Sequence, residues 1–396
     1  MTSNGSWQKV RFDEICKNIS DRIDDPKQAK TDYYVGLEHL DSEDPKISRH
    51  GSPQDVSKTK LLFKPGHILF GKRNWYLRRL AVAQREGICS AHMLVLEPIE
   101  GKSTKEFLPL LMFGDDFYEK ALMVSAGSMS PTIKWKDLAP LEFLIPSIEQ
   151  QENILSLTHK IDQTISNSQN LLEKTKNYMI SRRELLLTRG IGHTKFKKVK
   201  WMFGKTIEIP EEWTIEKLSQ VCKIFESDNI DSDLYIGLEH IEQGTGKLLD
   251  RGNTKDFVST KHVFQKDNIL YGKLRPLLKK IWITTENGFC STDILSLEPN
   301  KKIIPTILAS ILLSTNFLSY AVSTSAGTKM PRTNWTDMKE YEICLPSIAE
   351  QEQISSILSN IDKQITQQQS HLTNLKVLRK SILNSKLTKE KTNVAN

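Results

Sequence analysis

The chain contains few cysteines and its first residues do not resemble a signal peptide. These two features argue against a zinc or redox protein and against a secreted protein. None of the five cysteines forms a C-x-x-C pair or lies near a histidine cluster, which argues against a zinc site and a redox motif. An odd cysteine count suits a reducing compartment. The first residues, MTSNGSWQKVRFDEI, have no apolar core after a basic start, unlike a signal peptide. We therefore expect a cytoplasmic protein.

Long apolar runs free of polar residues are also absent. The most apolar stretch, from Ile303 to Val322, is interrupted by a proline, serines and an asparagine. Its counterpart in the first half, from Phe107 to Val124, carries Asp115, Asp116, Glu119 and Lys120. A segment crossing lipid would not tolerate such charges, so both stretches are interpreted as amphipathic helices of a soluble protein.

Catalytic motifs are missing as well. The sequence has no Pro-Pro pair and thus lacks the Asn/Asp-Pro-Pro-aromatic motif of adenine amino-methyltransferases. Gly101-Lys102-Ser103 resembles the end of a phosphate-binding loop, but Leu96 stands where its first glycine is required. We expect no catalytic residue, no metal and no cofactor. The net charge, +7 from 55 basic and 48 acidic residues, permits a nucleic-acid partner without requiring one.

The strongest signal is an internal repeat with a spacing of about 200 residues. Five segments recur in the same order: YVGLEHL (34–40) as YIGLEHI (235–241), ILFGK (68–72) as ILYGK (269–273), GICS (87–90) as GFCS (288–291), SAGSMSPTIKW (125–135) as SAGTKMPRTNW (325–335), and IPSIEQQENI (145–154) as LPSIAEQEQI (345–354). A whole module was therefore duplicated. Cys16 and Cys222, like Cys89 and Cys290, occupy equivalent positions, and we interpret them as buried, inert thiols.

Each module combines a globular part with a helical part. Short β-type runs and turn residues predict α+β globular domains over residues 1–146 and 209–346. Proline and glycine then disappear for some forty residues, which predicts helical spacers over 147–190 and 347–390. Residues 191–208 are expected to link the halves; their lysines suit either a solvated tether or a contact with phosphates or partner subunits.

The helical spacers have the pattern of a coiled coil. Apolar residues follow three- and four-residue steps at Ile154, Ile161, Ile165, Leu172 and Met179, and at Ile354, Leu358, Ile361, Ile365, Leu372 and Leu375. Pro146-Ser147 and Pro346-Ser347 mark the helix starts with a proline and a hydroxyl N-cap. We expect the two helices to pair as an antiparallel coil with pseudo-two-fold symmetry; two independent surface helices are the alternative.

This duplicated layout resembles the specificity (S) subunit family of Type I restriction-modification enzymes over the range from Trp7 to about Leu387. The resemblance rests on the I/L-P-S-I-x-x-Q-x-x-I pattern at both helix starts and on the segments SWQKVRFDEIC and EEWTIEKLSQVC before the globular domains. It implies a non-catalytic subunit whose two target recognition domains read the halves of a split, asymmetric DNA site. It also implies docking of two modification (methyltransferase) subunits and, through them, restriction subunits. A coiled-coil scaffold and a degenerate methyltransferase or nuclease are the alternatives.

Two pairs of segments are candidates for DNA contact. GKRNWYLRR (71–79) and GKLRPLLKK (272–280) follow a glycine with basic, amide and aromatic side chains, which suit phosphates and base edges. The candidates in these segments are Lys72, Arg73, Asn74, Tyr76 and Arg78, with Lys273, Arg275 and Lys279. A solvated hairpin is the alternative.

The glycine-containing loop that follows the apolar helices is the second candidate, because exposed backbone amides can approach DNA closely. Its residues are Gly127, Ser128 and Lys134 in the first copy, and Thr328, Lys329, Arg332 and Asn334 in the second. A purely structural turn is the alternative. His39 and His240 recur beside Glu38 and Glu239, but without a nucleophile or metal-ligand partner we interpret them as structural.

Overall fold

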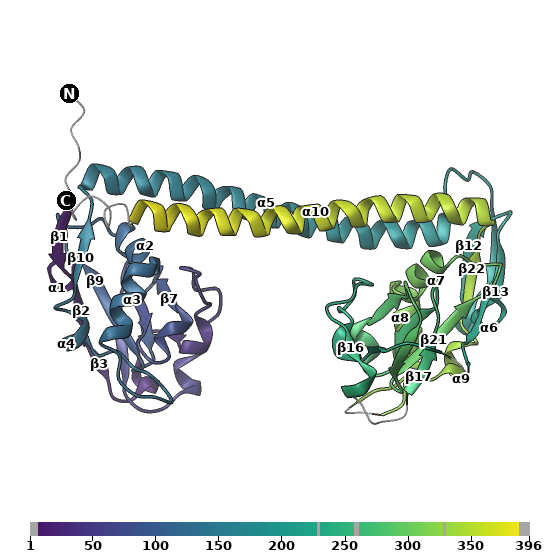
Figure 1. The fold of residues 1–396 in the computed structure, drawn as a ribbon, viewed down its shortest axis with the longest axis horizontal. Helices are drawn as coiled ribbons and strands as arrows, with labels where there is room; N and C mark the ends of the chain where they lie inside the picture. The colour runs from purple at the N-terminus through teal and green to yellow at the C-terminus, as the bar shows by residue number, and fades with distance from the viewer. Residues whose placement is uncertain (1–6, 228–229, 257–260, 328–329, 388–396) are drawn as a thin grey trace. The chain divides into compact units, whose positions relative to one another are not determined.

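The computed structural model describes residues 7–227, 230–256, 261–327 and 330–387. It divides into two compact units that are not continuous in sequence. The first unit comprises Met1–Gln169 and His371–Asn396, and the second comprises Asn170–Ser370. Each unit therefore contains one globular domain together with a segment of each of the two long helices, α5 (Ile148–Arg189) and α10 (Ile348–Leu387) (Figure 1).

The globular domain of the first unit is an α+β fold. Its elements are β1 (Gln8–Arg11), α1 (Phe12–Ile15), β2 (Cys16–Ile19), β3 (Arg22–Ile23), β4 (Tyr34–Val35), β5 (Lys60–Phe63), β6 (Ile68–Gly71), β7 (Leu80–Val82), β8 (Gly87–Cys89), β9 (Met93–Pro98), α2 (Phe107–Phe113), α3 (Asp115–Met123), α4 (Trp135–Leu138) and β10 (Glu142–Ile145), with short 3-10 turns η1 (Pro26–Gln28), η2 (Leu37–His39), η3 (Pro53–Asp55) and η4 (Trp75–Leu77).

Two four-stranded sheets form the body of this domain. One has the order β2-β9-β6-β7 and is antiparallel throughout; the other has the order β3-β5-β8-β4, in which β4 and β8 run parallel. The run Ile68–Gly71 is buried along its whole length because β6 lies at an interior position of its sheet. One core cluster continues from this sheet through α2 and α3 to Ile154 of α5 and Leu383 of α10, so the helices close the domain core.

The second unit repeats this plan. Its elements are β11 (Phe196–Lys200), β12 (Thr206–Pro210), β13 (Thr214–Lys217), α6 (Leu218–Val221), β14 (Cys222–Ile224), β15 (Leu234–Ile236), β16 (Gly252–Asn253), β17 (Lys261–Phe264), β18 (Ile269–Gly272), β19 (Ile281–Ile283), β20 (Gly288–Ser291), β21 (Ile294–Pro299), α7 (Pro305–Leu312), α8 (Thr315–Ser323), α9 (Trp335–Met338) and β22 (Glu342–Leu345), with 3-10 turns η5 (Met202–Gly204), η6 (Leu238–His240), η7 (Thr254–Asp256) and η8 (Pro276–Leu278). The sheets β14-β21-β18-β19 and β16-β15-β20-β17 correspond to those of the first unit.

The basic segment between the modules differs from the expected tether. Residues 196–210 form a β-hairpin in which β11 and β12 pair from Phe196 opposite Pro210 to Lys200 opposite Thr206. Apolar residues at alternate positions, Ile207 and Ile209, pack on the core of the second unit, so this face of the hairpin is held in place. Gly204 has φ +72° and permits the tight turn.

The long helices begin with the predicted caps and run antiparallel. The backbone N–H of Gln150 donates to Ser147 Oγ at 3.4 Å, and that of Glu350 donates to Ser347 Oγ at 3.3 Å. Within the first unit the N-terminal part of α5 lies beside the C-terminal part of α10, where Arg379 Nη2 donates to Asp162 Oδ2 at 3.2 Å. Within the second unit the other two segments pack together through the core. The predicted antiparallel helix pairing is confirmed.

Among the described residues, no single helix has the length and apolar composition needed to cross a membrane. Helices α7 and α8 meet the criterion only when taken together, and they are bent by 59° relative to each other. Their apolar side chains, including Ile307, Leu308 and Phe317, are buried in the core of the second unit.

Candidate nucleic-acid interface

The first candidate segment in each unit leaves a buried strand and enters a strained turn. After β6, Asn74 adopts φ 51°, and after β18, Arg275 adopts φ 52°. This left-handed region is unfavourable for a residue other than glycine, and arginine gains no local compensation there. The turn is held by Trp75 in one unit and Pro276 in the other, both buried. Strain at equivalent positions of both copies is typical of functional sites.

Backbone hydrogen bonds join this segment to the second candidate loop. In the first unit, the N–H of Asn74 donates to Pro131 O at 2.9 Å and the N–H of Ile133 donates to Lys72 O at 3.0 Å. In the second unit, the N–H of Arg275 donates to Pro331 O at 2.8 Å. Segments predicted separately therefore form one surface in each unit. We call this surface the paired loops: residues 72–76 with 126–134, and residues 273–277 with the described part of 326–334.

The first paired loops present basic, amide and aromatic groups to solvent. Arg73 is exposed, and its Nε donates to Ser130 Oγ at 2.8 Å. The Ser130 hydroxyl donates in turn to Asn74 Oδ1 at 3.1 Å. Tyr76 is 54% exposed. Ser130 therefore holds the guanidinium of Arg73 beside the amide of Asn74. These two bonds use Arg73 Nε and Asn74 Oδ1 and leave the other nitrogen atoms of both side chains for further hydrogen bonds.

Lys72 and the loop glycines complete the first surface. Lys72 is partly buried, and burial, together with the nearby charge of Arg22, lowers its pKa. Gly127, Ser128 and Lys134 are exposed, and Gly127 has φ +101°, which only glycine adopts readily. The loop thereby offers backbone groups unobstructed by a Cβ atom.

The second paired loops differ in their side chains. Arg275 is exposed, and its guanidinium makes no hydrogen bond or ion pair within the described part of the chain. Arg332 is exposed and pairs with Asp293 at 3.1 Å, beside the turn that holds Lys273. Thr328 and Lys329 lie outside the described residues. Of the described candidates in the second unit, Arg275 is the one most available to a ligand.

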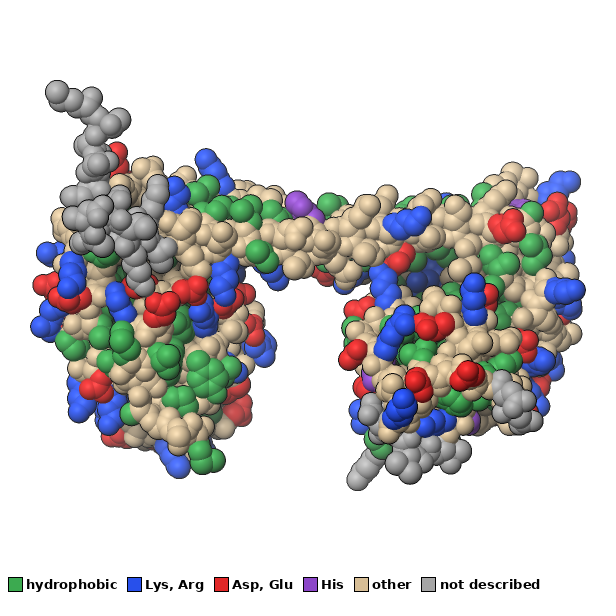
Figure 2. Space-filling view, viewed as in Figure 1, with side chains coloured by type: hydrophobic (Ala, Val, Ile, Leu, Met, Phe, Trp, Pro, Cys, Tyr) green, Lys and Arg blue, Asp and Glu red, His purple; other side chains and the backbone are tan. Residues whose placement is uncertain are grey.

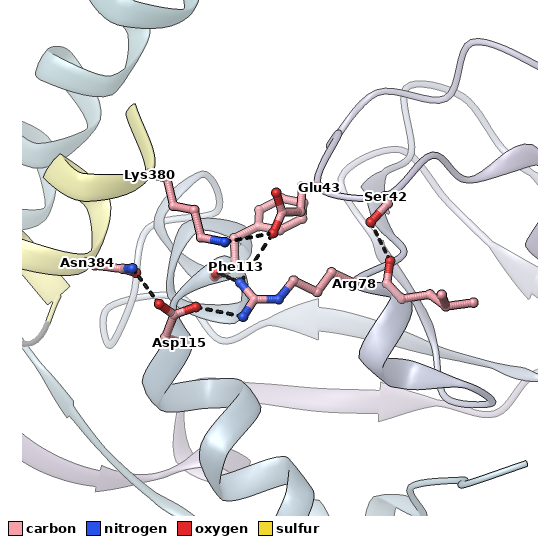
Figure 3. Close-up of polar contacts among 8 residues, drawn as sticks. Ser42, Glu43, Arg78, Phe113, Asp115, Lys380 and Asn384 are labelled. Atoms are coloured by element: carbon pink, nitrogen blue, oxygen red, sulfur yellow. Dashed lines mark hydrogen bonds and ion pairs between the residues drawn. The ribbon is translucent and has the colours of Figure 1, made fainter. Parts of the chain in front are cut away.

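Three of the candidates have side-chain partners within their domain. Arg78 points away from the paired loops into an ion-pair network: its Nη2 lies 2.6 Å from Asp115 and its Nη1 lies 3.4 Å from Glu43 (Figure 3). Lys279, its equivalent, points the same way and donates to Leu313 O at 3.3 Å. Asn334 caps α9, accepting from the backbone N–H of Asp337 at 2.8 Å. Spacing along the chain predicted these residues, but their side chains serve contacts within the domain.

The Arg78 network attaches the first domain to α10. Lys380 of α10 lies 3.4 Å from Glu43, and Asn384 donates to Asp115, which also binds Arg78 (Figure 3). Burial alone would raise the pKa of Asp115, but the hydrogen bond and charge of Arg78 outweigh it and hold that pKa below its usual value. The carboxylate is therefore ionised at neutral pH, and the ion pairs persist.

The recurring histidines have a structural role. His39 Nδ1 accepts from the backbone N–H of Gly36 at 2.9 Å, and His240 Nδ1 accepts from that of Gly237 at 3.0 Å. The cysteines are unpaired, and burial raises the pKa of Cys222 and Cys290 to about 12, so their thiols stay protonated. Within the described ranges, no group of three or more His, Cys, Asp or Glu side chains has the geometry to hold a metal ion.

Two buried glutamines were not predicted as functional, although they belong to the repeated helix-start pattern. Gln151 Oε1 accepts from Thr104 N at 2.9 Å, and its Nε2 donates to Pro146 O at 3.0 Å. Gln351 accepts from Ile304 N at 3.0 Å and donates to Lys302 O at 2.9 Å. Both side chains are fully buried. They fix the start of each long helix to the backbone of the domain that precedes it.

Glu350 is a second unpredicted anchor, present in one unit only. Its carboxylate accepts from His193 Nε2 at 2.8 Å, from Ile191 N at 3.0 Å and from Trp213 Nε1 at 2.8 Å. These bonds tie the segment after α5 to the start of α10. Gln150 occupies the equivalent position in the first unit, and its Oε1 has no hydrogen-bond partner among the described residues. The difference between Gln150 and Glu350 at equivalent positions of the repeat was the signal in the sequence.

Charge on the surface is mixed. On the face drawn in Figure 2, lysines and arginines of each unit alternate with acidic and apolar side chains. A uniform basic surface would indicate binding driven by phosphates alone. On this face the basic side chains do not form one uniform patch.

The chain contains two copies of one α+β module. Each copy exposes polar loops and packs against the two long helices, as expected of a duplicated recognition protein. The chain belongs to the family of the Type I restriction modification DNA specificity domain, whose model matches residues 4–177 and 210–375. It is thus a DNA-recognition, non-catalytic subunit of a Type I restriction-modification system.

Individual relatives agree with this assignment. The chain is 26% identical to the Type I restriction enzyme EcoDI specificity subunit of Escherichia coli over 71% of this chain and 69% of that protein. It is 24% identical to the MjaVIII specificity subunit of Methanocaldococcus jannaschii over 77% and 74%. A chain from a solved structure of a type I R-M system covers 97% of this chain, with 98% of its own length, at 18% identity and a TM-score of 0.65. That likeness concerns the fold.

Proposed function

We propose that the chain reads a bipartite, asymmetric DNA site, one half with each set of paired loops. The observation that carries this proposal is that the loops share their backbone frame but differ in side chains. Arg73, Asn74 and Tyr76 in the first unit correspond to Leu274, Arg275 and Leu277 in the second. Different donors and acceptors on the same frame select different bases, so the half-sites should differ.

The proposed contacts follow from the chemistry of the base edges. Arg73 and Arg275 suit guanine O6 and N7, and Asn74 suits adenine N6 and N7. Phosphate contacts are assigned to the remaining exposed or partly exposed groups of the paired loops: Lys72, Tyr76, Gly127, Ser128, Lys134, Lys273 and Arg332, with Thr328 and Lys329 retained from the sequence. Arg78 and Lys279 are left out because they are directed to Asp115 and Leu313 O, away from the paired loops, and Asn334 is left out because it caps α9.

The long helices are the proposed docking surface for two modification subunits, through which restriction subunits join in the cytoplasm. Leu171, Tyr178 and Leu185 of α5 recur every seven residues and are 53%, 55% and 46% exposed. Large apolar side chains at heptad spacing on one helix favour packing against a partner helix. Leu378 of α10, equivalent to Tyr178, is 48% exposed.

Tyr178→Glu is expected to weaken binding of the modification subunit by about 10-fold or more, because a charge replaces an aromatic anchor. Isothermal titration calorimetry with the purified subunits measures the change. Asn177→Glu, at the neighbouring exposed position, introduces the same side chain outside the stripe and is the matched control. Equal losses in the two variants would contradict docking on this stripe.

Recognition of a split site predicts a specific methylation pattern. Host DNA should carry N6-methyladenine at a two-part asymmetric motif, and deletion of the gene should remove the mark at that motif only. Single-molecule sequencing of the parent and the deletion strain makes the comparison. A complemented strain serves as the control, and methylation unchanged by the deletion would refute the proposal in that host.

A further inference from the structure

In each unit the globular domain contacts the long helices near the turn that follows the third strand of the main sheet. The charged residues at this contact differ between the two units. In the first unit, Arg78 binds Glu43 and Asp115, while Lys380 binds Glu43. Each cation in this place has a carboxylate partner (Figure 3). In the second unit Lys279 takes the place of Arg78, Gly244 and Thr315 replace the two carboxylates, and Glu184 stands at the position of Asn384.

Glu43 and Gly244 occupy the same backbone position. The N–H of Glu43 donates to Arg78 O at 3.0 Å, and that of Gly244 donates to Lys279 O at 3.1 Å. Both residues have a left-handed backbone, with φ 59° and 74°. A Cβ atom built on Gly244 would meet no other atom within 4 Å. The second unit therefore has open space where the first has a carboxylate side chain.

A buried cation without a partner faces this space. Arg183 of α5 is 9% exposed, and its Nε has no hydrogen-bond partner among the described residues. The equivalent residue of α10 in the first unit is Leu383, which is apolar. Burial of an unpaired guanidinium is costly. Arg183 and residues 242–247 line the same cavity of about 450 Å³.

The charges of Glu184 and Asp362 favour the charged form of Arg183, but burial outweighs them and lowers its pKa. Asp362 lies 3.4 Å from Lys247, and Glu184 Oε1 accepts from the backbone N–H of Thr315 at 2.6 Å. Glu242 accepts from Thr245 Oγ1 at 2.7 Å. Burial lowers the pKa of Lys279, and the charge of Arg183 lowers it further, so the two cations repel each other. The cavity is lined by three cations, Lys176, Arg183 and Lys247, and by two carboxylates, Glu242 and Asp362, so positive charge is in excess.

We propose that this cavity binds a small phosphate or carboxylate anion, held by Arg183 of its lining and by the nearby charge of Lys279, in the place that corresponds to the Glu43 side chain of the first unit. An arginine can bind such an anion through two parallel N–H groups, and a lysine adds a point charge. The bound anion would fasten the second domain to its helices as Glu43 fastens the first. The site does not depend on the reading of DNA.

Inorganic phosphate added to the purified full-length chain tests the proposal. At phosphate about ten-fold above its Kd, and at ionic strength matched with chloride, the Tm should rise by about 3–5 °C. Calorimetric titration should give one saturable site. Citrate in a parallel titration distinguishes a preference for carboxylates from one for phosphate. A Tm that does not respond to either anion overturns the proposal.

Two variants and a control locate the site. Gly244→Glu supplies the missing carboxylate in the left-handed conformation that Glu43 adopts in the first unit, so it should abolish the shift with phosphate. Arg183→Met should also abolish the shift. Arg189→Met, on the exposed face of the same helix, should retain it. If Arg183→Met fails to fold, Gly244→Glu decides the question, because it removes no existing contact. A phosphate shift that persists in Gly244→Glu places the anion elsewhere and overturns the proposal.

Discussion

Replacing Arg73 and Arg275 together with alanine is expected to lower the affinity for target DNA by about 10²–10⁴-fold, since each arginine–guanine contact contributes about 1–3 kcal/mol of discrimination. Both side chains are exposed on strained, well-held turns, so their loss should leave the fold intact. Fluorescence anisotropy with the subunit assembled on its modification subunits measures the affinity. The salt concentration must be the same for all variants.

The single variants make the test more specific. Arg73→Ala should relax sequence preference in one half-site, and Arg275→Ala in the other. Arg49→Ala with Arg251→Ala is the matched control, because these arginines are also exposed but pair with Asp41 and Glu286 outside the paired loops. A comparable loss in the control pair, or no loss in the test pair, would show that the paired loops do not read DNA.

Gln351→Leu is expected to destabilise the second unit by about 3 kcal/mol. The substitution keeps a side chain of similar size but removes the partner of the buried carbonyl of Pro346 and of the part-buried N–H of Ile304 and carbonyl of Lys302. Each unsatisfied group costs about 1–3 kcal/mol, and relaxation of the site recovers part of the sum. Urea denaturation followed by circular dichroism gives the free energy of unfolding.

Gln364→Leu is the control for this experiment, since Gln364 lies on the exposed side of α10. It should change stability by less than about 0.5 kcal/mol. Gln151→Leu should destabilise the first unit by a similar amount to Gln351→Leu, because Gln151 makes the equivalent bonds. If Gln351→Leu and Gln364→Leu had equal effects, the buried amide would not be an anchor.

The architecture was predictable because its signals are local or repeated. Proline followed by serine marked each helix start, and the predicted spacers of about forty residues correspond to helices of 42 and 40 residues. Burial of Ile154, Ile165, Ile354 and Leu358 agrees with the predicted seam. The repeat itself indicated two domains of one kind, which the paired sheets confirm.

The site was only partly predictable because side-chain direction depends on tertiary contacts. Arg73 and Arg78 lie in one basic segment, yet one faces solvent and the other binds Asp115. Nothing local distinguishes them, since Asp115 is remote in sequence. The hairpin at 196–210 was likewise hidden, because its lysines masked the alternate apolar residues that pack on the domain.

The buried glutamines bear on how such proteins change over generations. Gln151 and Gln351 bond to backbone atoms of their domains, at residues 102 and 104 and at residues 302 and 304, and not to side chains. An attachment of this kind constrains the path of the chain and is indifferent to what the rest of the domain is made of. A different globular domain, acquired by recombination, could therefore form the same hydrogen bonds with the existing helices, provided that its backbone follows the same path at these residues. A domain exchanged whole would keep these backbone bonds, whereas the side-chain contacts of its core with α5 and α10 would have to be matched again.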